Sequence, residues 1–228
     1  MQLRGKRALM TGVTGGLGPA LVEAFLALGA EVLATGRRRT ALDDLRAGVS
    51  HHERLHTAEC DVADAEGTEA LFDAWARKGA PDVVVHAAGA WVDGPIESQS
   101  DDAIERVVRD NFTSAALVLR AAMRRMRPTG RGSVVMIAAS RAADPDASEA
   151  LFGAAKAAVV HLVEATAKDS GGVRINAVLP GVLDTDENRA KLPGPVRGRV
   201  APAEVARAAL WLASDESGGV NGASVRLA

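Results

Sequence analysis

The stretch LMTGVTGGLGPALVEAF, residues 9–25, decides the fold of this chain. Its glycines at 12, 16 and 18 lie between a short apolar run and a segment whose apolar residues have helical spacing. Glycine lets a backbone approach a pyrophosphate closely, and the positive end of a helix dipole attracts the same group. Because a second strand-like run follows at 31–36, the stretch predicts a strand, a phosphate-binding turn and a helix.

The same alternation of short apolar runs and helical segments continues to the end of the chain. Strand-like runs occur at 7–12, 31–36, 54–61, 82–89, 133–139, 173–181 and 224–228. Helical segments lie between them at 19–29, 40–48, 65–79, 101–126, 148–169 and 203–214. This order predicts an α/β protein with a doubly wound Rossmann fold, in which a seven-stranded parallel sheet has helices on both faces. A length of 228 residues fits a single domain, 1–228.

The composition excludes several classes of partner. Lys and Arg number 27 against 29 Asp and Glu, a net charge of −2, which does not favour a nucleic acid or an anionic membrane. The N-terminus lacks a signal-peptide pattern and the single Cys60 permits no internal disulfide, so we expect a cytoplasmic protein. Histidines and carboxylates show no metal-ligand spacing, and no metal is expected. The expected partners are a dinucleotide cofactor and a small-molecule substrate.

Two further segments bear on the ligand. The irregular stretch at 184–200 is rich in Pro, Gly and charge, and it follows the sixth strand, so we expect a short substrate lid there. The second strand ends in Thr35-Gly36-Arg37-Arg38-Arg39, where an NAD-binding chain usually carries a carboxylate. Guanidinium groups pair with a 2′-phosphate, so Arg37 and Arg38 favour NADP(H) over NAD(H). Arg39 is expected to be a solvated residue at the helix entry.

These motifs together resemble the short-chain dehydrogenase/reductase family along nearly the whole chain. TGVTGGLG is similar to the family's cofactor loop, CDVAD to its adenine-binding segment, HAAG at 86–89 to its Asn-Asn-Ala-Gly motif, and RINAVLPGVLDT to the segment over the nicotinamide. Asn111 matches the family's helix asparagine. The resemblance implies cofactor contacts from Gly12, Thr14, Gly16, Leu17, Gly18, Asp61, Val62, Ala88, Gly89, Lys156, Pro180, Gly181, Leu183 and Thr185.

The departures from the family concern its proton-transfer residues. The family has Tyr-x-x-x-Lys, whereas this chain has Phe152 before Lys156 and contains no tyrosine at all. The family's serine lies about thirteen residues before the tyrosine, which leads to Ala139. Ser140 is the next residue, but in a continuing strand its side chain would point to the opposite face. Asn111 and Lys156 are therefore the residual catalytic residues, and Ser140 is expected not to replace the serine unless the strand has ended before it.

Two functions follow from this pattern, and the sequence does not decide whether the chain is an enzyme. One is an NADP(H)-binding protein with a degenerate site, in which the usual carbonyl reduction is absent or very slow. The alternative is an NADP(H)-dependent oxidoreductase for a carbonyl or hydroxyl substrate, with Lys156, water or His86 as the proton donor. An engineered change of Tyr to Phe at position 152 is a less favoured explanation, since Ala139 also differs from the residue that the family has at its position. The family resemblance implies a homodimer or homotetramer through the helices at 101–126 and 148–168.

Overall fold

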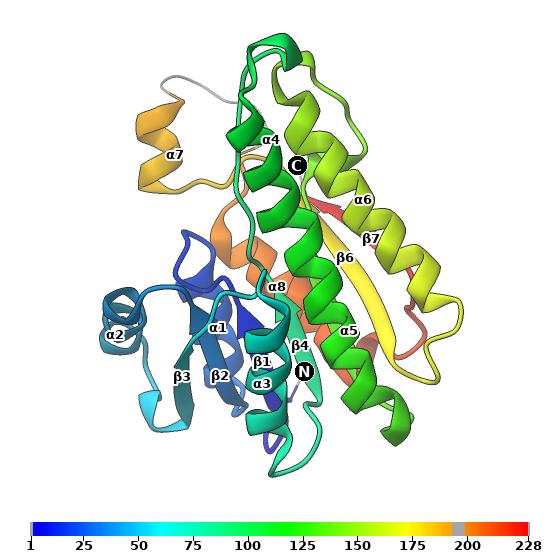
Figure 1. Cartoon of the computed structure of the whole chain (residues 1–228). Coiled ribbons are helices and arrows are strands. Elements are labelled where there is room, and N and C mark those ends of the chain that lie inside the picture. Colours follow the sequence, from blue (N-terminus) through cyan, green and yellow to red (C-terminus); the bar gives the residue numbers. More distant parts are fainter. Residues whose placement is uncertain (1, 193–198, 228) are drawn as a thin grey trace.

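The computed structural model describes residues 2–192 and 199–227, and Figure 1 shows a twisted sheet between two layers of helices. The sheet has the order β3-β2-β1-β4-β5-β6-β7, and all neighbouring strands are parallel. The strands are β1 (Arg7–Thr11), β2 (Glu31–Gly36), β3 (Leu55–Glu59), β4 (Val83–His86), β5 (Ser133–Ile137), β6 (Arg174–Pro180) and β7 (Ser224–Leu227). The predicted seven-stranded parallel sheet is confirmed.

Helices cover both faces because successive strand residues point to opposite sides of the sheet. Along β4, for example, Val83 and Val85 join one core, whereas Val84 joins the other. The first core contains residues of α1 (Gly18–Ala27), α2 (Arg39–Gly48) and α8 (Pro202–Ala213), and the second contains residues of α3 (Ala65–Ala76), α5 (Ser114–Met126) and α6 (Ala150–Ala167). The expected two-layer arrangement of helices is thus present.

The strand order reverses between β1 and β4, which are neighbours in the sheet although two strands separate them in the sequence. In such sheets ligands bind beyond the carboxyl ends of the strands at the point of reversal. The glycine-rich turn follows β1 at this edge, and Ala87 follows β4, where its N–H donates to the carbonyl of Thr11 at 3.0 Å. The fold therefore places both segments at the expected cofactor crevice.

Several element ends differ from the sequence prediction. β4 ends at His86 and β5 at Ile137, two to three residues earlier than expected. The predicted single helix at 101–126 is divided into α4 (Asp101–Val107), a π-helical turn (Val108–Thr113) and α5. Apolar periodicity does not reveal a π-helical turn, since it adds only one residue to the helix.

One helical stretch, Ala147–Ala167, is long and apolar enough to cross a membrane by length and composition. It contains α6, which packs on β6 and carries the buried Lys156. On its inner side α6 contributes Val159, Val163 and Ala167 to the second core.

Candidate functional site

The turn after β1 requires glycine at two positions for different reasons. Gly12 has φ +74°, and a Cβ there would lie 2.3 Å from the backbone nitrogen of Ala88. A Cβ on Gly18 would lie 1.7 Å from the carbonyl oxygen of Val13, so the turn folds directly against the start of α1. This compact turn leaves the N-terminus of a ten-residue helix facing the crevice. A pyrophosphate fits such a site because backbone N–H groups and the helix dipole both attract it.

The expected lid begins against this turn. A Cβ on Gly16 would lie 2.9 Å from Cγ2 of Thr185, which caps the short helix α7 (Asp186–Lys191) by accepting from the Asn188 N–H at 3.2 Å. Leu183 and Val200 form a parallel bridge, so the two ends of the segment meet. Residues 193–198 of the predicted lid lie outside the described residues. The structure therefore brings Thr185 to the cofactor loop.

Charged side chains gather at the carboxyl ends of β2 and β3, where the adenosine part of a cofactor is expected. Nη1 of Arg37 lies 3.3 Å from Asp110, and Arg109 binds both Asp110, at 3.0 Å, and Asp61. Burial alone would raise the pKa of Asp61, but the hydrogen bonds and charge of Arg109 lower it below the usual value. Sequence analysis identified Arg37 and Asp61 here, and it missed Arg109 and Asp110.

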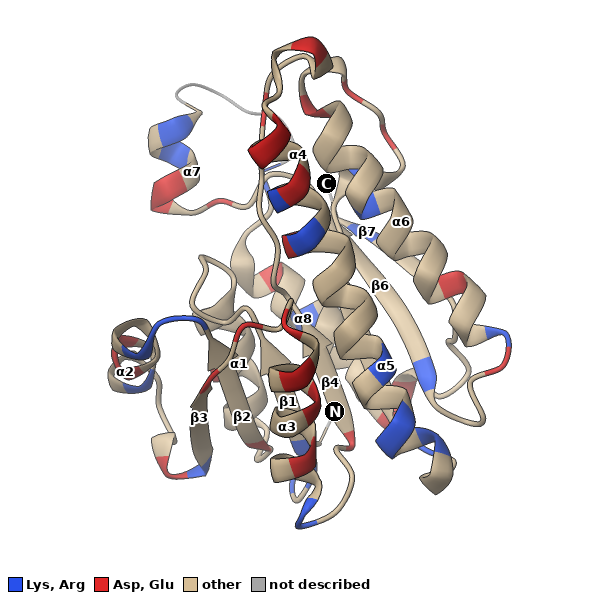
Figure 2. Ribbon diagram, in the orientation of Figure 1, with Lys and Arg blue, Asp and Glu red and all other residues tan. Residues whose placement is uncertain are grey.

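The three arginines 37–39, before and at the start of α2, differ in their ion pairs. Figure 2 shows them as a blue segment that leads into α2. Arg39 pairs with Asp43 one turn later, at 3.3 Å, as expected for a solvated helix position. The Arg37 side chain is 62% exposed, and within the described residues it forms an ion pair with Asp110, whereas Arg38 forms none there. Arg37 and Arg38 thus retain N–H groups for an anionic ligand.

Asn111 and Lys156, the expected residual catalytic residues, both lie against Gly89. A Cβ at this glycine would lie 2.6 Å from Oδ1 of Asn111 and 3.0 Å from Nζ of Lys156. Nζ of Lys156 donates to the carbonyl of Ile137 at 3.1 Å and lies 5.8 Å from the centre of the Phe152 ring. Burial lowers the pKa of Lys156 to about 8. The structure therefore places Asn111 and Lys156 at Gly89, with the Phe152 ring beside Lys156, as the spacing of four residues predicted for this last pair.

Asn111 is held in place by its own amide. Nδ2 donates to the carbonyls of Ala90, at 2.8 Å, and Val107, at 3.0 Å, while the buried Oδ1 has no hydrogen-bond partner among the residues that the structure describes. A buried acceptor without a partner is costly, so an Oδ1 that points at the crevice is suited to receive a hydrogen bond from a bound group. The Oδ1 of Asn111 and the backbone around Gly12 and Gly18 both fit a dinucleotide in this crevice.

His86 has a different environment from the one a proton donor needs. It is 1% exposed, and its two ring nitrogens face Thr11 Oγ1 at 2.8 Å and Ser114 Oγ at 3.3 Å. Burial and the charge of Lys156 lower the pKa of His86 to about 3. The ring is therefore neutral near pH 7 and joins β1, β4 and α5. This structural role argues against the expectation that His86 is an alternative proton donor.

Ser140 requires a correction to the strand argument. β5 ends at Ile137, Ala139 is extended and 8% exposed, and Ser140 opens a short 3-10 turn that packs on α6. Strand alternation consequently does not fix the direction of the Ser140 side chain. The expectation that Ser140 does not replace the serine applied only to a continuing strand, and the strand ends before Ser140, so Ser140 stays a candidate for that role.

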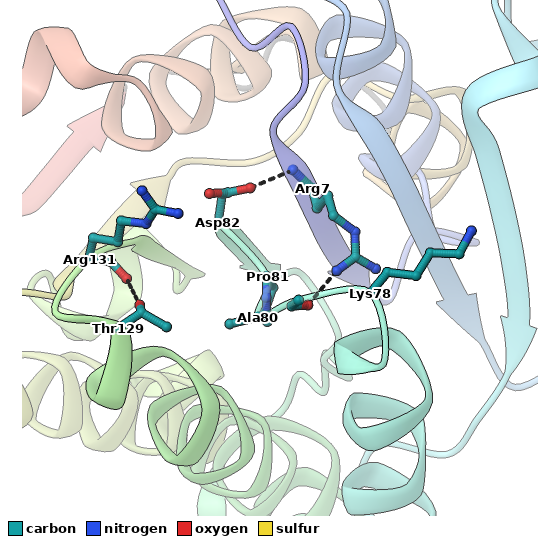
Figure 3. Close-up of a pocket in the computed structure, with 8 residues that line it drawn as sticks. Arg7, Lys78, Ala80, Pro81, Asp82, Thr129 and Arg131 are labelled. Atoms are coloured by element: carbon teal, nitrogen blue, oxygen red, sulfur yellow. Dashed lines mark hydrogen bonds between the residues drawn. The ribbon is translucent and has the colours of Figure 1, made fainter.

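A small cavity of about 190 Å³ lies at the opposite, amino-terminal edge of the sheet (Figure 3). Arg7 lines it, but its guanidinium already donates to the carbonyls of Trp75 and Gly79 and lies 4.1 Å from the Trp75 ring. These contacts hold the protein together at this edge. Within the described residues, no group of three or more His, Cys, Asp and Glu side chains is arranged to hold a metal ion.

Comparisons with known proteins agree with this geometry. A family model described as enoyl-(acyl carrier protein) reductase matches residues 12–227. A solved short-chain dehydrogenase/reductase family protein has a TM-score of 0.90 and 30% identity over 100% of this chain and 97% of its own. The chain belongs to the short-chain dehydrogenase/reductase family.

Other members of the family indicate the class of chemistry. D-threitol dehydrogenase of Mycolicibacterium smegmatis is 32% identical over 98% of this chain and 92% of its own length. A gluconate 5-dehydrogenase from Burkholderia cenocepacia, solved in complex with NADP and tartrate, has a TM-score of 0.89 and 27% identity over 99% of this chain and 94% of its own. The chain is thus a member of an oxidoreductase family whose relatives include dehydrogenases that bind nicotinamide dinucleotides.

Proposed function

We propose that the chain binds NADP(H) in a degenerate active site, so that the usual carbonyl reduction is absent or very slow. The observation that carries this proposal is the Phe152 ring beside the buried Nζ of Lys156, at 5.8 Å. A bound nicotinamide exchanges a hydride with the substrate carbon, and the protein has to handle the accompanying proton. Phe152 has no proton to give, and Ala139 has no hydroxyl to hold the substrate oxygen. The lost general acid alone accounts for a factor of about 10² to 10⁴ in rate.

Calorimetry and turnover assays on the same preparation test this proposal. We expect NADP⁺ to bind with a dissociation constant in the range of about 1 to 100 μM, because the residues of the cofactor crevice are separate from those that are lost. We expect no oxidation of NADPH above background with a broad panel of aldehydes and ketones. Rapid turnover with any of these carbonyls, or failure to bind NADP⁺, would contradict the proposal.

The preference for NADP(H) rests on Arg37 and Arg38, whose exposed guanidinium groups follow β2. In the double variant Arg37→Gln/Arg38→Gln, we expect NADP⁺ to bind about tenfold more weakly and NAD⁺ to bind as before, because only NADP⁺ has a 2′-phosphate. Arg39→Gln is the matched control, since Arg39 already pairs with Asp43. If the double variant loses the same affinity for NADP⁺ and for NAD⁺, Arg37 and Arg38 are not the basis of a preference for NADP(H).

A second candidate function is an NADP(H)-dependent oxidoreductase in which Lys156 is the proton donor. Its ammonium uses one N–H on Ile137, it is buried, and its pKa is lowered to about 8. In this function the ammonium gives a proton to the substrate oxygen, and solvent then protonates the resulting amine. The lowered pKa favours such a transfer, since an acid with a pKa near the working pH is the most effective.

The pH dependence of carbonyl reduction tests Lys156 as the donor. The charged form dominates below its pKa, so the rate should be constant below pH 8 and fall about tenfold per pH unit above it. Lys156→Met should abolish the activity, whereas Lys168→Met, an exposed position at the end of α6, should keep it. A rate that is independent of pH between 7 and 10 would exclude Lys156 as the donor.

Assembly and location are also part of the proposal. We propose a homodimer or homotetramer through the helices at 101–126 and 148–168, in the cytoplasm. The helix α6 supports this. Of the 18-residue apolar stretch within Ala147–Ala167, only 28% is buried inside the protomer. Ile104 and Val108, one turn apart on the other helix, are 37% and 43% exposed. Burial of such apolar surface is a common basis for association. The substrate is proposed to be a small carbonyl or hydroxyl compound.

A further inference from the structure

Four side chains of alternating charge form a continuous chain at the carboxyl ends of β2 and β3. In order they are Arg37, Asp110, Arg109 and Asp61. Arg37 follows β2 directly, and Asp61 follows β3, the neighbouring strand. Arg109 and Asp110 come from the π-helical turn that also carries Asn111. The sequence motifs accounted for two of these four residues, and the other two come from an element that is remote in the sequence.

Arg109 is the residue that neutralises both carboxylates. Its Nη1 donates to Oδ1 of Asp110 at 3.0 Å, and its Nη2 donates to Oδ2 of Asp61. Asp110 is 10% exposed on its side chain, so it has little access to solvent, and its other oxygen meets only Arg37, at 3.3 Å. Without Arg109, two carboxylates would share the single, largely exposed Arg37.

This charge balance matters for a ligand that bears an additional phosphate. A 2′-phosphate bound by Arg37 and Arg38 after β2 would lie near Asp61, which follows the neighbouring strand β3, and near Asp110, which pairs with Arg37. Uncompensated carboxylates repel such a dianion, and the repulsion is screened only partly over a few ångströms. NAD⁺ lacks that phosphate, so it is much less sensitive to the same charges. Arg109 therefore affects the affinity for NADP⁺ more than the affinity for NAD⁺.

We propose that Arg109, on the helix that carries Asn111, is a specificity-determining residue that permits binding of a 2′-phosphorylated dinucleotide by neutralising Asp61 and Asp110. The inference rests on the proposed function, since it assumes that the crevice binds a nicotinamide dinucleotide. The pKa values of these groups agree with strong pairing: that of Asp61 is lowered, and that of Arg109 is raised, mainly by its hydrogen bond to Asp61.

Calorimetric titration of NADP⁺ and NAD⁺ into Arg109→Gln tests the proposal. We expect the ratio of the dissociation constants, NADP⁺ over NAD⁺, to rise about tenfold relative to the wild type, with the change diminishing at high salt. Arg109→Lys keeps the charge and should stay within about threefold of the wild-type ratio. Arg131→Gln, an exposed position at the opposite edge of the sheet, has the same change in net charge and should leave the ratio unchanged.

A compensating variant separates charge from structure. If Arg109 acts by neutralisation, adding Asp110→Asn to Arg109→Gln removes one of the two carboxylates that Arg109 neutralises and should recover most of the lost NADP⁺ affinity. An equal loss of both cofactors in Arg109→Gln, or no recovery in the double variant, would overturn the inference while leaving the proposed function intact. If the wild type binds neither dinucleotide, both the proposed function and the inference fail.

Discussion

The double variant Phe152→Tyr/Ala139→Ser should reduce carbonyl substrates with NADPH about 10² to 10⁴ times faster than the wild type. The phenol would be introduced beside the buried Nζ of Lys156, which is 5.8 Å from the centre of the present ring. A neighbouring positive charge lowers the pKa of a phenol from about 10 and so makes it a better acid. Steady-state NADPH oxidation with a panel of aldehydes and ketones measures the gain.

Two controls separate the restored proton donor from other effects of the substitutions. Ala139→Ser alone adds a hydrogen-bond donor without a general acid, so its gain should be much smaller. Adding Lys156→Met to the double variant should remove the gain, because the phenol loses its cationic neighbour and the cofactor loses a contact. If the double variant stays as inactive as the wild type although it binds NADPH, the pocket has been reshaped for another task, and proton transfer is not what limits it.

Gly12→Ala should abolish detectable dinucleotide binding and lower the free energy of unfolding by about 3 kcal/mol. The backbone at Gly12 has φ +74°, and a Cβ would come within 2.3 Å of the Ala88 nitrogen. The turn would have to move away from the end of β4, which displaces the N–H groups expected to face the pyrophosphate. Urea denaturation and NADP⁺ calorimetry measure the two effects.

Gly48→Ala is the matched control for this substitution. A Cβ on Gly48, at the end of α2, meets nothing within 4 Å, so this change should leave both stability and binding within the error of the wild type or slightly improve stability. Wild-type affinity in Gly12→Ala would show that the turn is not part of the cofactor site.

The fold could be predicted from the sequence because its signals are local. The glycines of the turn and the apolar strands each specify their own conformation, and the order of strands and helices then predicts the parallel sheet. The glycine turn and the shared helix face of Phe152 and Lys156 follow from local spacing, whereas Asn111 and the role of Lys156 were predicted from the resemblance to the family. The structure brings Asn111 and Lys156 together at Gly89, and it brings Gly12 against Ala88.

The parts that could not be predicted depend on contacts between distant segments. Arg109 meets Asp61 only because the π-helical turn passes over the end of β3, and the sequence contains no sign of that approach. The burial of His86 between Thr11 and Ser114, which lowers its pKa, likewise involves three separate elements. The early end of β5 at Ile137 changed the interpretation of Ser140, because strand ends depend on the neighbouring strand and on the crevice.

The π-helical turn at Val108–Thr113 has a consequence for how this helix can vary. Each residue of an α-helix advances the side-chain direction by about 100°, so the additional residue of the turn sets α4 and α5 out of phase by about that angle. α4 buries Val107, α5 buries its own apolar stripe, and Asn111 projects from between them with its amide on the Val107 carbonyl. Removing a single residue here would rotate half of the helix relative to the other half. The length of this segment is therefore constrained independently of its side chains, because one residue more or fewer changes the direction of every side chain on one side of the turn.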